Sequence, residues 1–551
     1  MLLLALPFFA LYYSQVESVS RRGLIPGIRV PASHRTPLFK PPLIANHSLR
    51  TSHPHPSSPV FNSLRNEWIG DGHLQFTFDL LNGIFMNSLD MKTGNLESIA
   101  FSPFSIQSIL MMIHLGAKGQ TKSEIAKVLH IDAAENNVTF SKSHEAFGKA
   151  VRSLLEDAAL GKSLHSANQI FVQDGLPISN SYSLALKHYH LAYVKYVNFA
   201  KDSYSVLNLI NEWIEKQTAQ MISNFLTTPP SPMTSLMAVN AIRFKGEWQY
   251  RFDPSDTEAN AWFRMINGHT TKVEMMVAQL PLAYAYNAAL QTSIIELPYK
   301  TSRLSFFVLL PDDTFGLFSL LGSLNATVFA NLIFSMRKVN HGGSGGGSGG
   351  TGGGAVANDK QSSSTVSAAG SSAGVNVRLP KFAINSMPRI TNVLRTQMGL
   401  KSLFSNEDAN LEAMFSSRAA SLGSSSPGRV HMDELLHKAI LKVDEVGSVG
   451  AAVSTSSIER VGTFTGPYFE ADHPFVYLLM DKQTGLALFA GFYAGPNGGA
   501  SGGGGGGGGP SGGTNEQQQP PHSSANFVQN GGKVGQAYAA LFGNGNKNEA
   551  H

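Results

Sequence analysis

Two serines, Ser344 and Ser348, each lie in a G-x-S-x-G pattern, which is typical of a hydrolase nucleophile elbow. An elbow requires a strand before the serine and a helix after it. These serines instead lie in a glycine-rich tract, residues 341–374, that produces such matches by composition alone. The H-E-x-x-H and P-loop patterns are absent from the sequence. We therefore predict no catalytic residues and no metal site in this chain.

A small uncharged segment, residues 447–458, reads GSVGAAVSTSSI and contains no proline. It follows an acidic pair and precedes the sequence ERVG at residues 459–462. Such a segment can lie exposed as a loop or enter a sheet as a strand without burying an unpaired charge. In a strand, its alternate side chains from Ser448 to Ile458 would share one face. A mobile Gly/Ser/Ala linker is the alternative that composition alone favours.

Composition limits the class of protein. The chain has 551 residues, of which 42% are hydrophobic, so it can bury a large core. Its formal charge of +4 comes from 42 basic and 38 acidic residues spread along the chain, and no basic stripe indicates nucleic-acid binding. The absence of cysteine excludes disulfides, thiolate metal ligands and a cysteine nucleophile.

The two ends of the chain differ from its middle. Residues 1–18 contain an apolar run that is too short to span a bilayer and is typical of a secretory signal; a buried N-terminal helix is the alternative. Residues 19–73 form a Pro/His/Ser-rich extension, and residues 497–551 form a Gly/Asn/Gln-rich tail. We expect a secreted, extracellular protein with no membrane span after signal removal. Its sequons would accept glycans at Asn46, Asn137 and Asn325.

The middle of the chain, residues 74–496, alternates helical and strand periodicities and predicts a mixed α+β class, although its length alone would favour more than one domain. Residues 78–85 have helical spacing, whereas residues 304–310 and 474–480 are apolar runs of strand length, as expected for strands buried on both faces. The tract at 341–374 lies between an amphipathic run and a strand-like run. We expect it to extend from a surface loop.

Several ordered motifs in this domain resemble one family, the serpins. They are AFSPFSIQSILMMIHLGAKGQTKSEI (residues 100–125), LHSANQIFVQ (164–173), INEWIEKQT (210–218), VNAIRFKGEWQYRF (239–252), VEMM (273–276), ELPY (296–299), LPKF (379–382), HKAILKVDEVGSVGAA (437–452) and ADHPFVYLLMDKQTGLALFAG (471–491). The resemblance implies a fold of three β-sheets with about nine surrounding helices and an exposed reactive-centre loop. It also implies that the loop can add to the central sheet as a strand, a known instance of strand addition.

The resemblance assigns roles to residues on both sides of the loop. It implies a hinge at which loop insertion starts, formed by Glu445, Gly447, Ser448, Gly450, Ala451 and Ala452. It implies a polar cluster under the central strands, where the sheet must part, formed by Ser102, Ser105, Asn240 and His437. Trp248 matches the family's tryptophan near the top of that sheet. For each of these residues, ordinary core packing is the alternative.

The bond that a protease would cut is expected about sixteen residues after the hinge glutamate, and some family members are one residue shorter. The shorter count places the reactive bond at Arg460–Val461, and the longer count places it at Val461–Gly462. We favour Arg460, because a guanidinium suits the acidic specificity pocket of trypsin-like proteases, whereas Val461 suits an elastase-like slot. A solvated loop charge at Arg460 is the remaining alternative.

From these observations we expect a monomeric inhibitor that traps a serine protease, with a trypsin-like enzyme favoured, as an acyl complex. No cofactor is expected, and the basic residues within 145–162 are offset by acidic ones, so we expect no strong heparin dependence. A non-inhibitory serpin that acts as a carrier or chaperone is the first alternative. A serine hydrolase that uses the glycine tract is the second.

Overall fold

The structure is a computed structural model, and it describes residues 69–131, 137–157, 160, 163–338, 374–416, 430–448 and 466–497. All described residues belong to one compact unit. Residues 341–373 of the 341–374 tract, residues 498–551 of the tail and residues 1–18 lie outside the described residues.

Nine α-helices and three short 3₁₀ helices occur in the part of the chain that is described. The α-helices are α3 (Ile69–Ser88), α4 (Pro103–Gly116), α5 (Gly119–Val128), α6 (Asn137–Leu155), α7 (Asn180–His190), α8 (Ser203–Gln217), α9 (Leu317–Ser323), α10 (Ala326–Ser335) and α11 (Ile390–Thr396). The 3₁₀ helices are η1 (Pro254–Asp256), η2 (Ser402–Phe404) and η3 (Glu412–Met414). Side-chain oxygens of Ser102, Ser179, Asp202 and Asn325 cap four of the α-helices at their first turns.

The largest sheet has seven strands, and its centre is fully buried. Its order is β1 (Ile99–Phe101), β18 (Ala487–Tyr493), β17 (Phe475–Asp481), β10 (Leu304–Pro311), β9 (Thr292–Pro298), β8 (Ala283–Asn287) and β11 (Arg337–Lys338). Strands β10 and β17 coincide with the apolar runs at 304–310 and 474–480, and every residue in them is buried. These two strand predictions are therefore confirmed.

Three further sheets occur among the described residues. The four-stranded sheet has the order β16 (Tyr468–Glu470), β12 (Val375–Pro380), β7 (Thr270–Leu280) and β6 (Glu258–Arg264). The five-stranded sheet has the order β13 (Phe382–Ser386), β14 (Glu434–Val443), β4 (Leu236–Phe244), β2 (Leu164–Gln173) and β3 (Val194–Val197). A two-stranded ladder joins β15 (Gly447–Ser448) to β5 (Gly246–Glu247). The α+β class and the three larger sheets are confirmed, and the short ladder is an addition that the sequence did not indicate.

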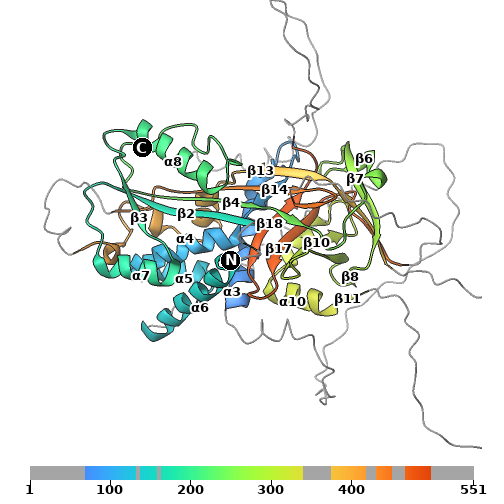
Figure 1. The fold of residues 1–551 in the computed structure, drawn as a ribbon, viewed down its shortest axis with the longest axis horizontal. Coiled ribbons are helices and arrows are strands. Elements are labelled where there is room, and N and C mark those ends of the chain that lie inside the picture. The colour runs from blue at the N-terminus through green and yellow to red at the C-terminus, as the bar shows by residue number, and fades with distance from the viewer. Residues whose placement is uncertain are drawn as a thin grey trace, which may run out of the picture. The chain divides into compact units, whose positions relative to one another are not determined.

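The five-stranded sheet is covered on both faces (Figure 1). Helix α8 packs one face through Val206, Ile210 and Ile214, which form a small separate core with alternate residues of β4. Helix α4 lies against the other face and contacts both β2 and β4. Because side chains alternate along a strand, Asn240 of β4 points toward the α4 side, between Val239 and Ala241 that point toward α8.

The first described helix begins before the expected start of the domain. Helix α3 begins at Ile69 rather than at residue 74 and buries His73, which bonds to Gln107 of α4 and to the backbone N–H of Ala487. Among the described residues, no single helix is long and apolar enough to cross a membrane; α9 and α10 reach that length and composition only as a pair bent by 108°.

Candidate functional site

The centre of the five-stranded sheet is a parallel seam. Strands β14 and β4 run parallel and are registered from Glu434–Met237 to Ile440–Arg243. A strand that follows β14 through a tight turn runs back antiparallel to β14, and therefore also antiparallel to β4. Such a strand would replace one parallel ladder with two antiparallel ladders. The seam is thus the place where this sheet can accept a strand from the chain that follows β14.

A buried histidine bonds across the seam. His437 of β14 and Asn240 of β4 are registered partners, and His437 Nδ1 contacts Asn240 Oδ1. His437 Nε2 accepts a hydrogen bond of 2.9 Å from the backbone N–H of Ser102. Burial lowers the pKa of His437 to about 3, so the ring is neutral, with its proton on Nδ1. Parting the strands must break this bond or turn the ring.

The same network extends into the helix layer and the neighbouring strand. Ser102 Oγ accepts a hydrogen bond of 3.2 Å from the N–H of Ser105 as the cap of α4, and Ser105 Oγ lies 3.3 Å from Ser166 Oγ of β2. Asn240 Nδ2 donates to Asn168 Oδ1 and, at 3.3 Å, to Ala167 O. The structure therefore brings together all four residues of the predicted polar cluster.

Ser166 and Asn168 were missed by the sequence reasoning. Both lie in LHSANQIFVQ at alternate positions, so they share the face of β2 that points toward α4. The spacing of these two small polar side chains, at a period of two on one face of the strand, was a signal that could have identified them. Their partners could not have been assigned, because those partners lie on β4 and α4.

The end of β14 is a closed turn. The N–H of Asp444 donates to Gly447 O at 2.8 Å, and Asp444 Oδ1 accepts from the N–H groups of Val446 and Gly447 at 3.0 and 3.1 Å. The indole N–H of Trp248 donates to Asp444 O at 2.8 Å. The turn is therefore held both by its own acidic side chain and by the tryptophan.

The hinge glutamate is anchored to two other elements. Glu445 Oε1 accepts hydrogen bonds from Thr257 Oγ1 at 3.0 Å and from Lys381 Nζ at 3.3 Å. Burial alone would raise the pKa of Glu445, but the hydrogen bonds it accepts and the charge of Lys381 outweigh burial and lower it. The carboxylate is thus ionised and ties the turn to the strand that begins at Phe382.

Ser448 is already buried in this state. Gly447 and Ser448 form β15, which pairs antiparallel with β5, and Ser448 Oγ lies 2.7 Å from the hydroxyl of Tyr299. Gly447 is required there, because a Cβ at this position would lie 1.9 Å from Gly246 O. Ser448 is 0% exposed, so this part of the predicted hinge is already packed against Tyr299 in the intact protein.

Trp248 fills the space beneath the hinge. Its side chain is fully buried, its ring stacks on Tyr299 with centroids 4.5 Å apart and planes at 25°, and it meets Phe306 at 5.9 Å. Its backbone N–H donates to Val446 O at 2.9 Å. Trp248 therefore contacts the turn through both its indole and its backbone.

The remaining sequence-based sites are only partly described. Gly450, Ala451, Ala452, Arg460, Val461, Gly462 and Asn46 lie outside the described residues. Asn137 begins α6, and Asn325 is half-buried, with its Oδ1 accepting from the N–H of Val328 at 2.9 Å. The last described residue before segment 449–465 is Ser448 of the β15–β5 ladder, and the first after it is Gly466, which precedes β16.

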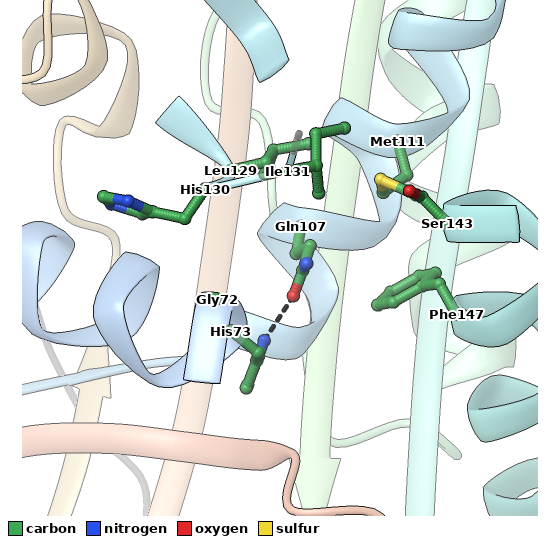
Figure 2. Close-up of a pocket in the computed structure, with 9 residues that line it drawn as sticks. All are labelled: Gly72, His73, Gln107, Met111, Leu129, His130, Ile131, Ser143 and Phe147. Carbon is green, nitrogen blue, oxygen red and sulfur yellow. Dashed lines mark hydrogen bonds between the residues drawn. The ribbon is translucent and has the colours of Figure 1, made fainter. Parts of the chain in front are cut away.

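Two other features were considered as sites. A cavity of about 10 Å³ is lined by residues of α3, α4 and α6 and by residues 129–131. Figure 2 shows that His73 points toward Gln107 at this cavity. A cavity of that size holds at most one water molecule. No group of three or more His, Cys, Asp or Glu side chains is arranged to hold a metal ion in the part of the chain that the structure describes.

Comparison with known proteins gives one consistent result. The model of a family described as Serpin (serine protease inhibitor) matches residues 72–342 and 357–496. Ovalbumin of Dromaius novaehollandiae is 30% identical over 432 residues, which cover 77% of this chain and 98% of ovalbumin. Intracellular coagulation inhibitor 2 of Tachypleus tridentatus is 28% identical over 396 residues, which cover 72% of this chain and 85% of the inhibitor. The solved structure of thyroxine-binding globulin with thyroxine has a TM-score of 0.61 at 21% identity, and the match covers 78% of this chain and 100% of the globulin.

Proposed function

The chain belongs to the serpin family, and from that premise we propose that it inhibits a serine protease by acting as a suicide substrate. Family members are mostly protease inhibitors, and this chain is proposed to have no catalytic residues of its own. The observation that carries the proposal is the closed parallel seam between β14 and β4, directly before the segment that would insert. Residues 447–458 are uncharged and small, apart from the larger apolar residues Val449, Val453 and Ile458, and they would form the inserted strand.

In the proposed reaction, the serine of the protease attacks the carbonyl carbon of Arg460. The Arg460–Val461 peptide bond breaks, Val461 leaves as an amine, and an ester joins Arg460 to the protease. The freed segment then enters the seam, between β4 and β14. Cleavage at Val461–Gly462 is the alternative position.

Insertion must overcome identifiable contacts. The His437–Asn240 bond across the seam and the Ser448–Tyr299 bond at the hinge both have to break or rearrange. An inserted strand of about a dozen residues would form on the order of ten additional backbone hydrogen bonds, at roughly 1 kcal/mol each. That gain is comparable to the stability of a whole domain, about 5 to 15 kcal/mol. It is therefore large enough to distort the active site of a protease that is attached to the inserted segment.

The proposal includes a target class and a location. Arg460 favours a trypsin-like protease, because its guanidinium suits an acidic specificity pocket. Residues 1–18 would direct secretion, with glycans at Asn46, Asn137 and Asn325, and the mature domain, residues 74–496, would act as a monomer. Glycosidase treatment of protein collected from the medium of secreting cells tests the location and the glycans together.

Incubation with trypsin-like and elastase-like proteases tests the function. We expect a complex with a trypsin-like enzyme that survives boiling in detergent, because an acyl bond is covalent. Mass spectrometry should place the cut after Arg460, and Arg460→Ala should slow complex formation at least tenfold. Cleavage of the loop without a stable complex would favour the non-inhibitory alternative. An elastase-like enzyme trapped after Val461 would move the reactive bond by one residue.

A further inference from the structure

A second cavity, of about 190 Å³, lies between four helices and strand β2. Residues from α4, α6, α7, α8 and β2 line it, together with the connection that follows α7. An engineered protein cavity of about 150 Å³ accommodates benzene. This cavity therefore has room for one aromatic ring with a short substituent, unlike the 10 Å³ cavity of Figure 2.

One side of the cavity is apolar and aromatic. Phe104, Met112 and Val151 line it from α4 and α6, and Trp213 lines it from α8. The ring of Trp213 meets Phe171 edge-on, with centroids 5.8 Å apart at 86°, so its orientation is set by the neighbouring strand. Rings of this kind provide a flat surface against which an aromatic ligand can stack.

The other side is polar, and a histidine is its most distinctive member. His190 lines the cavity and is only 8% exposed. Its Nε2 lies 3.0 Å from Nδ1 of His144, whose Nε2 lies 3.3 Å from Nδ1 of His114. In the described part of the chain, no hydrogen bond engages Nδ1 of His190. The ring thus has one nitrogen held by the histidine chain and one available to a ligand.

The charges around this histidine are positive. Lys122 of α5 and Arg152 of α6 face the histidine chain, while His188 and Tyr189 precede His190 on α7. No lining residue is Asp, Glu, Lys or Arg. Burial, followed by the charge of Arg152, lowers the pKa of His190 to about 3. A cation at His190 therefore lacks a counter-charge from the lining residues, and an anionic ligand would supply one.

We propose that this cavity binds a small aromatic carboxylate, with the ring against Trp213 and the carboxylate accepting a hydrogen bond from Nδ1 of His190. Binding takes up one proton, which His190 receives from solvent. The imidazolium then pairs with the carboxylate, and no covalent bond changes. This site is separate from the reactive loop, so it does not rest on the proposed inhibitory function.

Calorimetry with phenylacetate, using phenylacetamide as the neutral isostere, tests the site on the full chain. Between pH 7.5 and 5.5 the phenylacetate stays ionised, because carboxyl groups of this kind titrate near pH 4. We expect its Kd to fall about tenfold per pH unit, since one proton is taken up. Titrations in two buffers of different ionisation enthalpy should give an uptake close to one proton. The Kd of phenylacetamide should not change with pH.

Matched variants locate the proton. His190→Gln keeps a partner for His144 but cannot carry a charge, so it should abolish the pH dependence and the proton uptake. His188→Gln, on the exposed side of the same helix, should leave both unchanged. Phenylacetate that does not bind, that binds without proton uptake, or that keeps its pH dependence in His190→Gln would overturn the proposal. If His190→Gln does not fold, the proton uptake measured on the unaltered protein still tests the proposal.

Discussion

The hydrogen bond between Tyr299 and Ser448 offers a direct test of how the hinge is held. Both side chains are buried, and the two hydroxyl oxygens are 2.7 Å apart. Burial raises the pKa of Tyr299, so its hydroxyl stays protonated. Tyr299→Phe would leave the Ser448 hydroxyl buried without this partner and create almost no cavity. An unsatisfied buried hydroxyl costs about 1 to 3 kcal/mol, so we expect a loss of that size in the free energy of unfolding of the intact protein.

The double variant distinguishes the bond from general packing. Removing both partners with Tyr299→Phe and Ser448→Ala should be less destabilising than the sum of the single changes, by about 1 kcal/mol or more. Tyr284→Phe is the matched control, because Tyr284 and Ser293 are hydrogen-bonded at 3.2 Å on a half-buried surface. Urea unfolding at neutral pH compares the parent protein with these four variants. If Tyr299→Phe costs no more than Tyr284→Phe, or if the two hinge changes are additive, this bond does not anchor the hinge.

Three further predictions concern insertion, pH and the glycine tract. In an inserted strand, residues 450 and 452 would share the buried face of Ser448. Gly450→Arg and Ala452→Arg should therefore turn the inhibitor into a plain substrate, because burying an unpaired guanidinium in the sheet costs several kcal/mol. Ala451→Arg, on the opposite face, should still form the detergent-stable complex. The free energy of unfolding should fall below pH 6.5 by about 1.4 kcal/mol per pH unit for each buried neutral histidine, down to pH 4 to 3. Stability falls toward low pH because the pKa values of His73, His114 and His437 are lowered to about 4, 3 and 3, so the unfolded chain takes up protons that the folded chain excludes. Urea unfolding at pH 7, 6 and 5 measures the slope. An unfolding free energy that does not change with pH would contradict the neutral buried rings. Deleting residues 341–373 should change stability by less than about 1 kcal/mol, since loop-closure entropy varies with the logarithm of length; a larger loss in urea unfolding would show that the tract contacts the core.

The burial of Ser448 decides which substitutions test insertion cleanly. Arginine at Ser448 would place an unpaired charge inside the intact protein, beside Tyr299. It would therefore destabilise the starting state as well as the inserted state. By strand alternation Gly450 and Ala452 would share the face of Ser448 in an inserted strand, and arginine at either position leaves the Ser448 hydroxyl that bonds to Tyr299 in place. A comparison of intact-state stability with Ala451→Arg separates the two effects.

Local patterns in the sequence determined a large part of this fold. The apolar runs at 304–310 and 474–480 became buried strands, because a strand covered on both faces needs no polar alternation. The cap at Ser102 follows from a serine placed directly before a proline and an apolar helical run. The ordered motifs identified the family, and hence the three sheets, before any contact was known.

Tertiary structure alone decided the contacts that control the seam and the hinge. His437 and Asn240 are 197 residues apart, and they meet only because β14 and β4 are parallel neighbours in one register. Ser448 belongs to a short, uncharged segment that composition assigns to an exposed loop, yet it is buried because Gly447 allows the chain to approach β5. Sequence periodicity reports which face of an element is buried, because that is a property of neighbouring residues. Which side chain lies opposite depends on strand order and register, and these are set by packing between segments distant in the chain.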